Sequence, residues 1–372
     1  MEALNEIKNL IAQAKNICII PNQDNEPESI ANALALFYTL KELRKNVNLI
    51  IDRFPEKLSF LVPSIDYISS PKNVVISVPR DQADVSQIYY ERDQSHLKIH
   101  LTLDKGQLKK DHISFYYSDP KPDLVITLGI HDIQKELLGK LDSFGFILDT
   151  PIANLDDRPE NTRFGTINLI QPFSLSESTQ ELIQYVESWT PKAANCLLAG
   201  LITHYDNFTS KATSPDTFQR CADLVKMGAD HAWVTNELYA LSGQEMHFLG
   251  AILQNLKQES AHSPYIALLD TTDFQHFNHE QIASTVQALK TIRAHNDVLA
   301  LWKSHASDPM IKGFLFSKNP ATLTKLAAIQ GTLMQQGWTF IAVPGADLLG
   351  TKTAIIETLT GSLLPSNHVL SS

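Results

Sequence analysis

The chain has 372 residues, of which 43% are hydrophobic and 19% charged, which is ordinary for a globular protein with room for two domains. Its net charge of −10 argues against broad binding to long DNA, because proteins that hold such polymers through phosphates present a basic face. No apolar run reaches the roughly 18 residues of a membrane helix. The acidic start resembles no secretory signal, and the three cysteines form no CxxC pair, so we expect a cytoplasmic protein without a membrane partner.

The N-terminal part of the chain predicts an amphipathic helix over 3–15, followed by a strand, a helix and a second strand. The apolar run 17–20 ends at a proline and predicts a buried strand. A helix over 29–45 then leads into a strand over 47–51. Strand, helix and strand of this length form a βαβ unit, so we expect a parallel sheet with a right-handed crossover.

Residues 71–119 interrupt this rhythm and predict an inserted β-meander. Segments rich in β-formers are separated by turn signals, and we expect strands at 74–78, 85–90, 97–103 and 113–117. The tyrosine pairs of this insert, at 89–90 and 116–117, can stack on nucleic-acid bases or form cross-strand pairs. The insert can also dock a protein partner or form a homodimer.

The α/β rhythm returns after the insert, with strands expected at 123–128 and 146–148 and a helix at 133–141. A run of helices follows, at 176–189, 191–202, 215–227, 230–241 and 244–258. The second half predicts strands at 265–269, 298–302, 313–316 and 339–343, alternating with helices near 279–293, 321–336 and 352–360. We place the domain boundary between 258 and 259, which gives a first domain over 1–258 and a C-terminal domain over 259–372.

The most informative stretch lies between residues 154 and 183. It reads N-L-D-D-R-P-E-N-T-R-F-G-T-I-N-L, and after a short loop S-E-S-T-Q-E-L. This resembles the third signature of the DHH phosphoesterase superfamily, N-I-D-H-H-x-x-N-T-x-F-G-x-I-N-L followed by S-S-T-x-E-L, with both histidines replaced. The resemblance implies an α/β fold in which a parallel-sheet DHH-type domain and linker helices precede a smaller C-terminal α/β domain like the DHH-associated domain. In the oligoribonuclease, pAp-phosphatase and RecJ-like branch, it implies hydrolysis of short RNA or nucleotide phosphoesters with two Mn²⁺ ions.

In register with the family's four signatures, the metal-ligand positions are changed except at Asp156. They fall on Asn22, Glu26, Glu28, Gly129, Asp156, Asp157, Arg158 and His204. Two divalent ions about 3.5–4 Å apart need a shared anion between them. The family's bridging aspartate falls on Gly129, which has no side chain. The resemblance therefore predicts a phosphoesterase fold that is catalytically degenerate.

Glu28, Asp157 and His204 stand at positions that the resemblance places around one ion. Oxygen and imidazole donors suit Mn²⁺ or Zn²⁺. We expect no resident cofactor, with a single Mn²⁺ or Zn²⁺ on these residues as the alternative. Each residue also has a structural explanation: Glu28 as an acid at a helix N-terminus, Asp157 as a brace of the turn, and His204 as a hydrogen-bonded histidine.

The same reasoning gives a set of candidate ligand-binding residues, namely Arg158, Asn161, Ser178 and Thr179. A guanidinium can bind a phosphate through two parallel hydrogen bonds. Ser178 and Glu181 also have the spacing of a capping box, so a helix cap is the structural alternative to phosphate contact.

Three functions stay open at this point. The first is a degenerate phosphoesterase-like protein that binds a nucleotide, a short oligonucleotide or a protein partner in the interdomain cleft. The second is an active metal-dependent phosphoesterase with a rebuilt site, in which Asp132 or Asp149 replaces the bridge. The structural alternative for Asp132 is a cap of the helix that starts at residue 133. The third is a structural or interaction protein that uses the 71–119 insert.

Overall fold

The computed structural model divides the chain into two compact units, Met1–Leu238 and Tyr239–Ser372. No helix in the described part of the chain combines the length and the apolar character needed to cross a membrane. The structure describes residues 2–22, 27–51, 54–63, 73–79, 82–93, 95–118, 121–137, 149–260, 263–270, 273–274, 276–291, 297–303, 310–327, 329, 331–335, 337–345 and 347–360.

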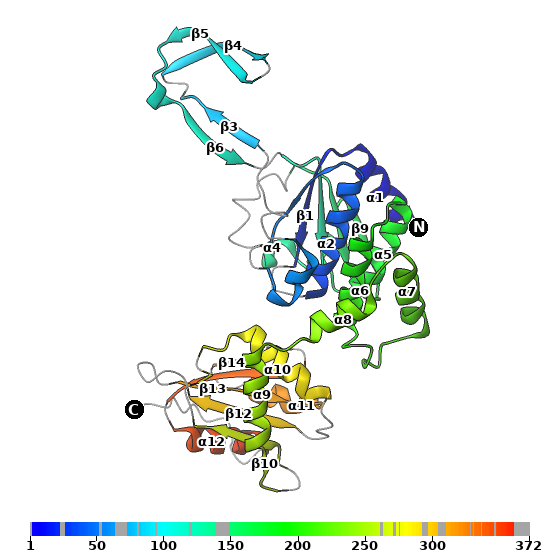
Figure 1. The fold of residues 1–372 in the computed structure, drawn as a ribbon, viewed down its shortest axis with the longest axis vertical. Helices are drawn as coiled ribbons and strands as arrows, with labels where there is room; N and C mark the ends of the chain where they lie inside the picture. The colour runs from blue at the N-terminus through cyan, green and yellow to red at the C-terminus, as the bar shows by residue number, and fades with distance from the viewer. Residues whose placement is uncertain are drawn as a thin grey trace. The chain divides into compact units, whose positions relative to one another are not determined.

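The first unit is built on a five-stranded parallel sheet with the order β2-β1-β7-β8-β9 (Figure 1). Its strands are β1 (Asn16–Pro21), β2 (Asn46–Leu49), β7 (Leu124–Leu128), β8 (Ile152–Asp156) and β9 (Ile167–Ile170). The chain goes from β1 outward to β2 and then returns to the other side of β1. The switch in strand order therefore lies between β1 and β7, and open α/β sheets bind ligands at such a point.

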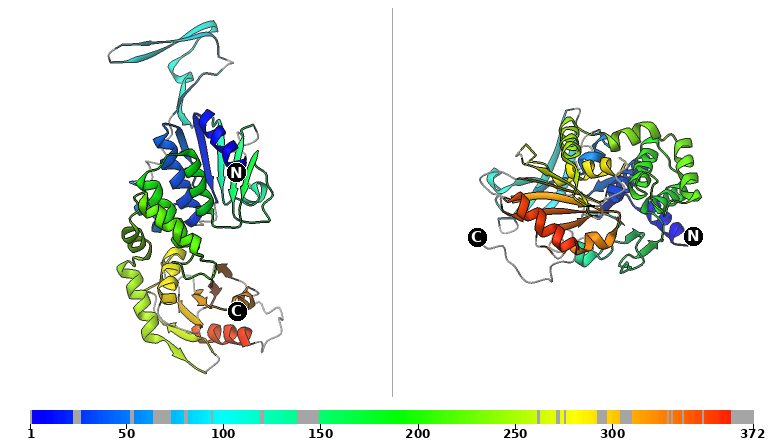
Figure 2. Two further views of the ribbon diagram at one scale, coloured as in Figure 1. Left: turned by 90° about the vertical axis from the view of Figure 1, so that its right-hand side faces the viewer. Right: turned by 90° about the horizontal axis from the view of Figure 1, so that it is seen from below.

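Helices cover this sheet because its strands are apolar on both faces. On one face α2 packs against β1 and also against α5 and α6, which lie beside it in Figure 2. On the other face Cys18, Val125 and Ile152 form a cluster with Ile133, the first residue of α4. The helices of this unit are α1 (Glu2–Gln13), α2 (Pro27–Glu42), α4 (Ile133–Glu136), α5 (Leu175–Val186), α6 (Pro191–His204), α7 (Pro215–Lys226) and α8 (His231–Tyr239), with a 3₁₀ turn η1 (Glu56–Leu61).

The insert contains the expected strands but is not a meander. The structure has β3 (Asn73–Ser77), β4 (Ala83–Arg92), β5 (Leu97–Gly106) and β6 (Ser114–Ser118), with a 3₁₀ turn η2 (Lys110–His112). A meander pairs each strand with the next one. Here β3 pairs with β6 and β4 pairs with β5, so one hairpin is nested inside the other as two separate two-stranded sheets. Tyr89 pairs across the strands with His100 and stacks on it, with ring centroids 4.6 Å apart.

The second unit is a mixed six-stranded sheet with the order β10-β11-β12-β13-β15-β14, in which only β11 and β12 are parallel neighbours among the described strands. Trp302 and Phe314 fill the core on one face, and α11 and α12 pack together beside the other. The elements are α9 (Gly243–Asn255), β10 (Lys257–Gln258), β11 (Tyr265–Leu269), α10 (His279–Thr291), β12 (Val298–Lys303), β13 (Met310–Phe316), α11 (Pro320–Leu326), β14 (Thr332–Gln335), β15 (Trp338–Pro344) and α12 (Leu348–Thr360).

The predicted α/β class with a parallel sheet is confirmed, and three details differ. The helix expected over 321–336 ends at Leu326, and Gly331, which adopts φ +88, precedes the edge strand β14. Strands β8 and β9 were not predicted, and the strand expected at 146–148 lies outside the described residues. The sequence placed the domain boundary after residue 258, whereas the compact units divide after Leu238. The division comes earlier because Phe248 and Ile252 of α9 belong to the core of the second unit.

Candidate functional site

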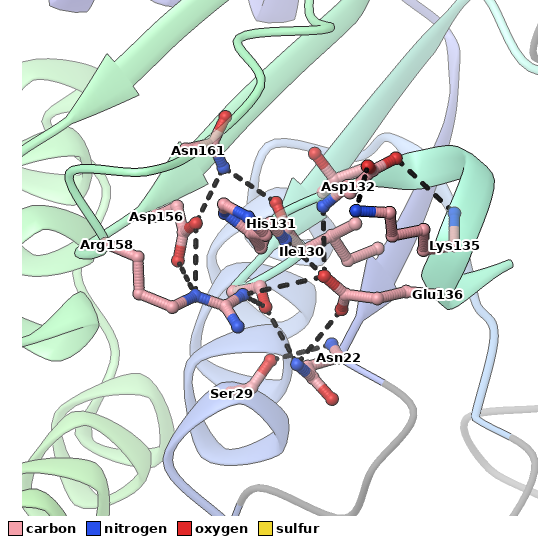
Figure 3. A network of polar contacts seen from close by, with 12 residues as sticks. Asn22, Ser29, Ile130, His131, Asp132, Lys135, Glu136, Asp156, Arg158 and Asn161 are labelled. Atoms are coloured by element: carbon pink, nitrogen blue, oxygen red, sulfur yellow. Dashed lines mark hydrogen bonds and ion pairs between the residues drawn. The ribbon is translucent and has the colours of Figure 1, made fainter.

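Three strand ends bring most of the candidate residues to one edge of the parallel sheet. Asn22 follows β1, Gly129 follows β7, and Asp156 closes β8 with Asp157 and Arg158 directly after it. The parallel register places Pro21 beside Leu128 and Leu128 beside Leu155, so these ends meet at the switch in strand order. Figure 3 shows the resulting polar network.

Gly129 stands where the resemblance expects a bridging carboxylate, and its backbone is adapted to having none. It adopts φ +64, a left-handed conformation that costs a residue with a side chain about 1 kcal/mol. A Cβ there would lie 3.4 Å from the Ser29 hydroxyl and 3.5 Å from Leu175. The carbonyl of Gly129 accepts hydrogen bonds from Asn22 Nδ2 at 2.9 Å and from Arg158. The bridging position therefore contributes only a backbone oxygen, and that oxygen already has donors.

Arg158 lies between two carboxylates. Its Nε is 3.1 Å from Asp156 Oδ1, and its terminal nitrogen is 3.9 Å from Glu136 Oε1. Asp156 is fully buried, so the guanidinium supplies the counter-charge that a buried carboxylate requires. Glu136, at the end of α4, also accepts hydrogen bonds from the backbone nitrogens of His131 at 2.6 Å and Asp132 at 3.0 Å.

Asn161 is a structural brace of this network. It is buried, and its Nδ2 donates to Asp156 at 2.6 Å and to the carbonyl of Ile130 at 2.8 Å. Its Oδ1 accepts from Asn154 at 2.9 Å and from the backbone of Arg163 at 2.8 Å. With each polar atom committed to the protein, Asn161 positions Asp156, and the structure does not support the predicted ligand contact.

A second cluster contains Glu28, Asp157 and His204, and one donor atom from each lies within 4.8 Å of the others. His204, the last residue of α6, places Nδ1 2.6 Å from Glu28 Oε2. The other oxygen of Glu28 accepts from the backbone nitrogen of Ser176 at 2.9 Å and from its hydroxyl at 3.0 Å. The structure thus brings together the three side chains that the resemblance placed around one ion.

The electrostatics of this cluster follow from burial and crowding of negative charge. Burial, assisted by the charges of Glu28 and Asp156, raises the pKa of Asp157 to about 6. Burial alone would lower the pKa of His204. The hydrogen bond and charge of Glu28, together with the charge of Asp157, outweigh that effect and raise its pKa. The cluster therefore favours uptake of positive charge.

Close helix packing holds Ser176 in place. A Cβ added at Gly200 of α6 would lie 2.3 Å from the Ser176 hydroxyl, so glycine allows α5 and α6 to approach here. Asn32 of α2 donates to the same hydroxyl at 2.9 Å. These contacts fix the donor that orients Glu28 toward His204.

The remaining predicted residues have structural roles or lie apart. Ser178 and Thr179 are fully buried inside α5, whose cap is Ser174, so the capping box predicted at Ser178 is wrong. Asp132 caps α4 by accepting from the backbone nitrogens of residues 134 and 135, which confirms the cap interpretation. Asp149 is exposed in a turn, and Glu26 lies outside the described residues.

Glu136 was not among the predicted site residues. The only sequence signal was its position one turn after Asp132, in a helix that was predicted but given no role in the site. Its contacts to Asn22 and Arg158 come from segments far away in the chain, so no local pattern could indicate them.

These residues fit one divalent cation and do not fit a pair. Glu28, Asp157 and His204 offer the oxygen and nitrogen donors that Mn²⁺ or Zn²⁺ accept. At the other positions, Gly129 has no carboxylate, Asn22 donates through its amide, and Arg158 is itself a cation. A bridged two-ion centre therefore has no bridging side chain among these residues.

Comparison with known proteins identifies relatives of this chain, although no family model matches it. A stretch of 108 residues is 25% identical to the bifunctional oligoribonuclease and PAP phosphatase NrnA of Thermus thermophilus, covering 28% of this chain and 33% of that protein. The match thus spans about a third of the relative's length.

Among solved structures, an exopolyphosphatase-related protein from Bacteroides fragilis superposes with a TM-score of 0.68 at 15% identity, over 97% of this chain and 96% of that one. The exonuclease RecJ bound to manganese aligns over 96% of this chain and 94% of its own at 12% identity, with a TM-score of 0.47. The fold shared along nearly the whole chain, the NrnA match and the signature around Asp156 make this protein a relative of the DHH phosphoesterase superfamily.

Proposed function

We propose that this protein binds a phosphate-bearing ligand, a nucleotide or a short oligonucleotide, at the carboxyl edge of its parallel sheet, and does so with one divalent cation. The observation that carries the proposal is the convergence of Glu28, Asp157 and His204 within 4.8 Å. When bound, such an ion would supply a positive charge that neutralises a phosphate oxygen. The relative NrnA, whose name refers to oligoribonuclease and PAP phosphatase activity, supports the ligand class.

Arg158 supports the same ligand from the protein side. Its side chain keeps 35% of its surface exposed while it pairs with Asp156. A guanidinium recognises phosphate through directed N–H donors, and the pairing with Asp156 fixes its orientation. The cation would thus bind on one side of the phosphate and Arg158 would contact it on the other.

Hydrolysis by a pair of ions is not part of this proposal. That chemistry stabilises both the attacking and the leaving oxygen with two ions held by a shared carboxylate. Gly129 provides a carbonyl at that position, and a substituted side chain would strain the left-handed backbone. We therefore propose a binding protein that has lost the family's two-ion reaction.

Calorimetric titration with Mn²⁺, and then with a dinucleotide or pAp, tests the proposal. We expect Mn²⁺-dependent ligand binding without turnover, weakened at least ~10-fold by Glu28→Gln through loss of a ligand. The matched control is Glu187→Gln, which changes an exposed glutamate paired with Lys8. Absence of Mn²⁺ binding would refute the proposal. Turnover that Glu28→Gln abolishes would instead support the active enzyme with a rebuilt site.

The insert supports a second candidate function, contact with another copy of this chain. Ile88, Tyr90 and Leu97 lie on one face of the β4–β5 ribbon and are 71%, 75% and 62% exposed. An isolated two-stranded ribbon is marginally stable in water, and an apolar face can pack against an identical face across a twofold axis. Mass measurement in solution tests this proposal: Tyr90→Ser with Leu97→Ser should convert a dimer to a monomer, and a monomeric wild type would refute it.

A further inference from the structure

We propose that the guanidinium of Arg158 occupies the place of a divalent cation. It lies in an oxygen cage formed by the carboxylates of Asp156 and Glu136 and the carbonyl of Gly129. Removing the guanidinium would convert this cage into a Mn²⁺ site. The cage is separate from the metal site of the proposed function, because Glu28, Asp157 and His204 supply none of its oxygens, and Arg158 is the residue that the two proposals share.

The contacts of Arg158 are those expected of a bound cation. Its Nε lies 3.1 Å and 3.3 Å from the two oxygens of Asp156. Its terminal nitrogen donates to the carbonyl of Gly129 and lies 3.9 Å from Glu136. In Figure 3 the guanidinium lies between Asp156 on one side and Glu136 and Asn22 on the other. Carboxylate and carbonyl oxygens are the donors that Mg²⁺ and Mn²⁺ prefer.

The cage oxygens are held in place by groups other than Arg158. Asp156 accepts from the backbone nitrogen of Asp157 at 3.0 Å and from Asn161 at 2.6 Å. Glu136 accepts from two backbone nitrogens, and from Asn22 at 3.2 Å. The backbone nitrogen of Gly129 donates to the carbonyl of Leu155 at 2.9 Å. Loss of the guanidinium would therefore leave a preorganised cage.

Charge balance favours a divalent replacement. Two carboxylates face one guanidinium, so the cage keeps an excess negative charge of one even with Arg158 in place. Asp156 is fully buried, and the exposed fraction of the Glu136 side chain is 17%, so solvent screens these charges poorly. Without Arg158 the cage carries two uncompensated charges, which one divalent ion would neutralise.

The test compares Arg158→Gln with Arg163→Gln, an arginine two residues after Asn161 that contributes no contact to the cage oxygens named above. Glutamine can still donate hydrogen bonds but carries no charge. Titration calorimetry and native mass spectrometry would count Mn²⁺ per chain. We expect Arg158→Gln to bind one ion more than the wild type, and Arg163→Gln to match the wild type. Adding Glu136→Gln to Arg158→Gln should remove the gained ion.

Thermal unfolding gives a second measurement that does not depend on the yield of the variant. Arg158→Gln should lose stability without metal and regain it in Mn²⁺, and a variant that needs help to fold should refold only when Mn²⁺ is present. An unchanged ion count, or equal refolding with and without Mn²⁺, would overturn the proposal. A wild type without Mn²⁺ and an Arg158→Gln variant with one ion would support this inference while refuting the metal site of the proposed function.

Discussion

The metal-free protein should be stabilised by Asp157→Asn at neutral pH, although this substitution removes a candidate metal ligand. Burial, assisted by the charges of Glu28 and Asp156, raises the pKa of Asp157 to about 6. An aspartate in the unfolded chain titrates near 3.9. Between about pH 4 and pH 6 the folded protein thus keeps a proton that the unfolded chain has released, so stability falls as pH rises through this interval.

The magnitude follows from this difference of about two pKa units, which corresponds to roughly 3 kcal/mol if it is fully expressed. Asp157 is only partly buried, so solvent screening reduces the expected effect to roughly 1–2 kcal/mol. The uncharged asparagine should recover that free energy at pH 7.5. For a unit of this size, the melting temperature should rise by roughly 2–8 °C.

The assay is thermal unfolding with chelator, followed by circular dichroism at pH 7.5 and at pH 4. Asp157→Asn should be more stable than the wild type at pH 7.5 and nearly equal at pH 4, where the wild-type carboxyl is protonated. The matched control is Asp156→Asn, which should destabilise because it removes the partner of Arg158. A melting temperature for Asp157→Asn at or below that of the wild type at pH 7.5 would refute the electrostatic reasoning.

Three further predictions concern contacts around the site and the sheet. Gly200→Ala should destabilise the first unit by roughly 2–3 kcal/mol, because its Cβ would lie 2.3 Å from the Ser176 hydroxyl; urea unfolding measures the loss. Backbone hydrogen bonds from Asn16 and Lys15 lower the pKa of Asp123, so its stabilising contribution is complete above about pH 4 and is lost as pH falls further. The melting temperature of Asp123→Asn should therefore fall less steeply below pH 4 than that of the wild type. Ser174→Ala should cost about 1 kcal/mol in thermal unfolding through loss of the α5 cap.

The sequence predicted the fold class because short apolar runs alternate with amphipathic helices. The pattern of apolar runs and their boundaries was sufficient for β1, α2 and β7, whose residues are nearly all buried. It was insufficient where a short strand follows a helix, as at β14, since a four-residue strand carries almost no periodic signal. The prediction of a meander in the insert failed for another reason. Strand pairing depends on which strands meet in the folded chain, and the residue pattern within a single strand does not determine its partner.

The candidate site was predicted through the resemblance, which put Glu28, Asp157 and His204 around one position, and the structure places these side chains together. The resemblance gave no indication that Arg158 would turn back onto Asp156. It gave none for Glu136 either, because that residue enters the site through backbone contacts at the start of α4.

The charge balance of the whole site favours cation-assisted binding over binding of a bare phosphate. Its carboxylates outnumber its cations by two, even with the histidine protonated, since Glu28, Glu136, Asp156 and Asp157 face Arg158 and His204. A phosphate entering this site without a metal would add negative charge to an existing excess, where burial, assisted by the charges of Glu28 and Asp156, already raises the pKa of Asp157. One divalent ion would cancel the excess of two. The affinity for a dinucleotide should therefore rise steeply with Mn²⁺, and equal affinity in chelator and in Mn²⁺ would show that this charge argument fails.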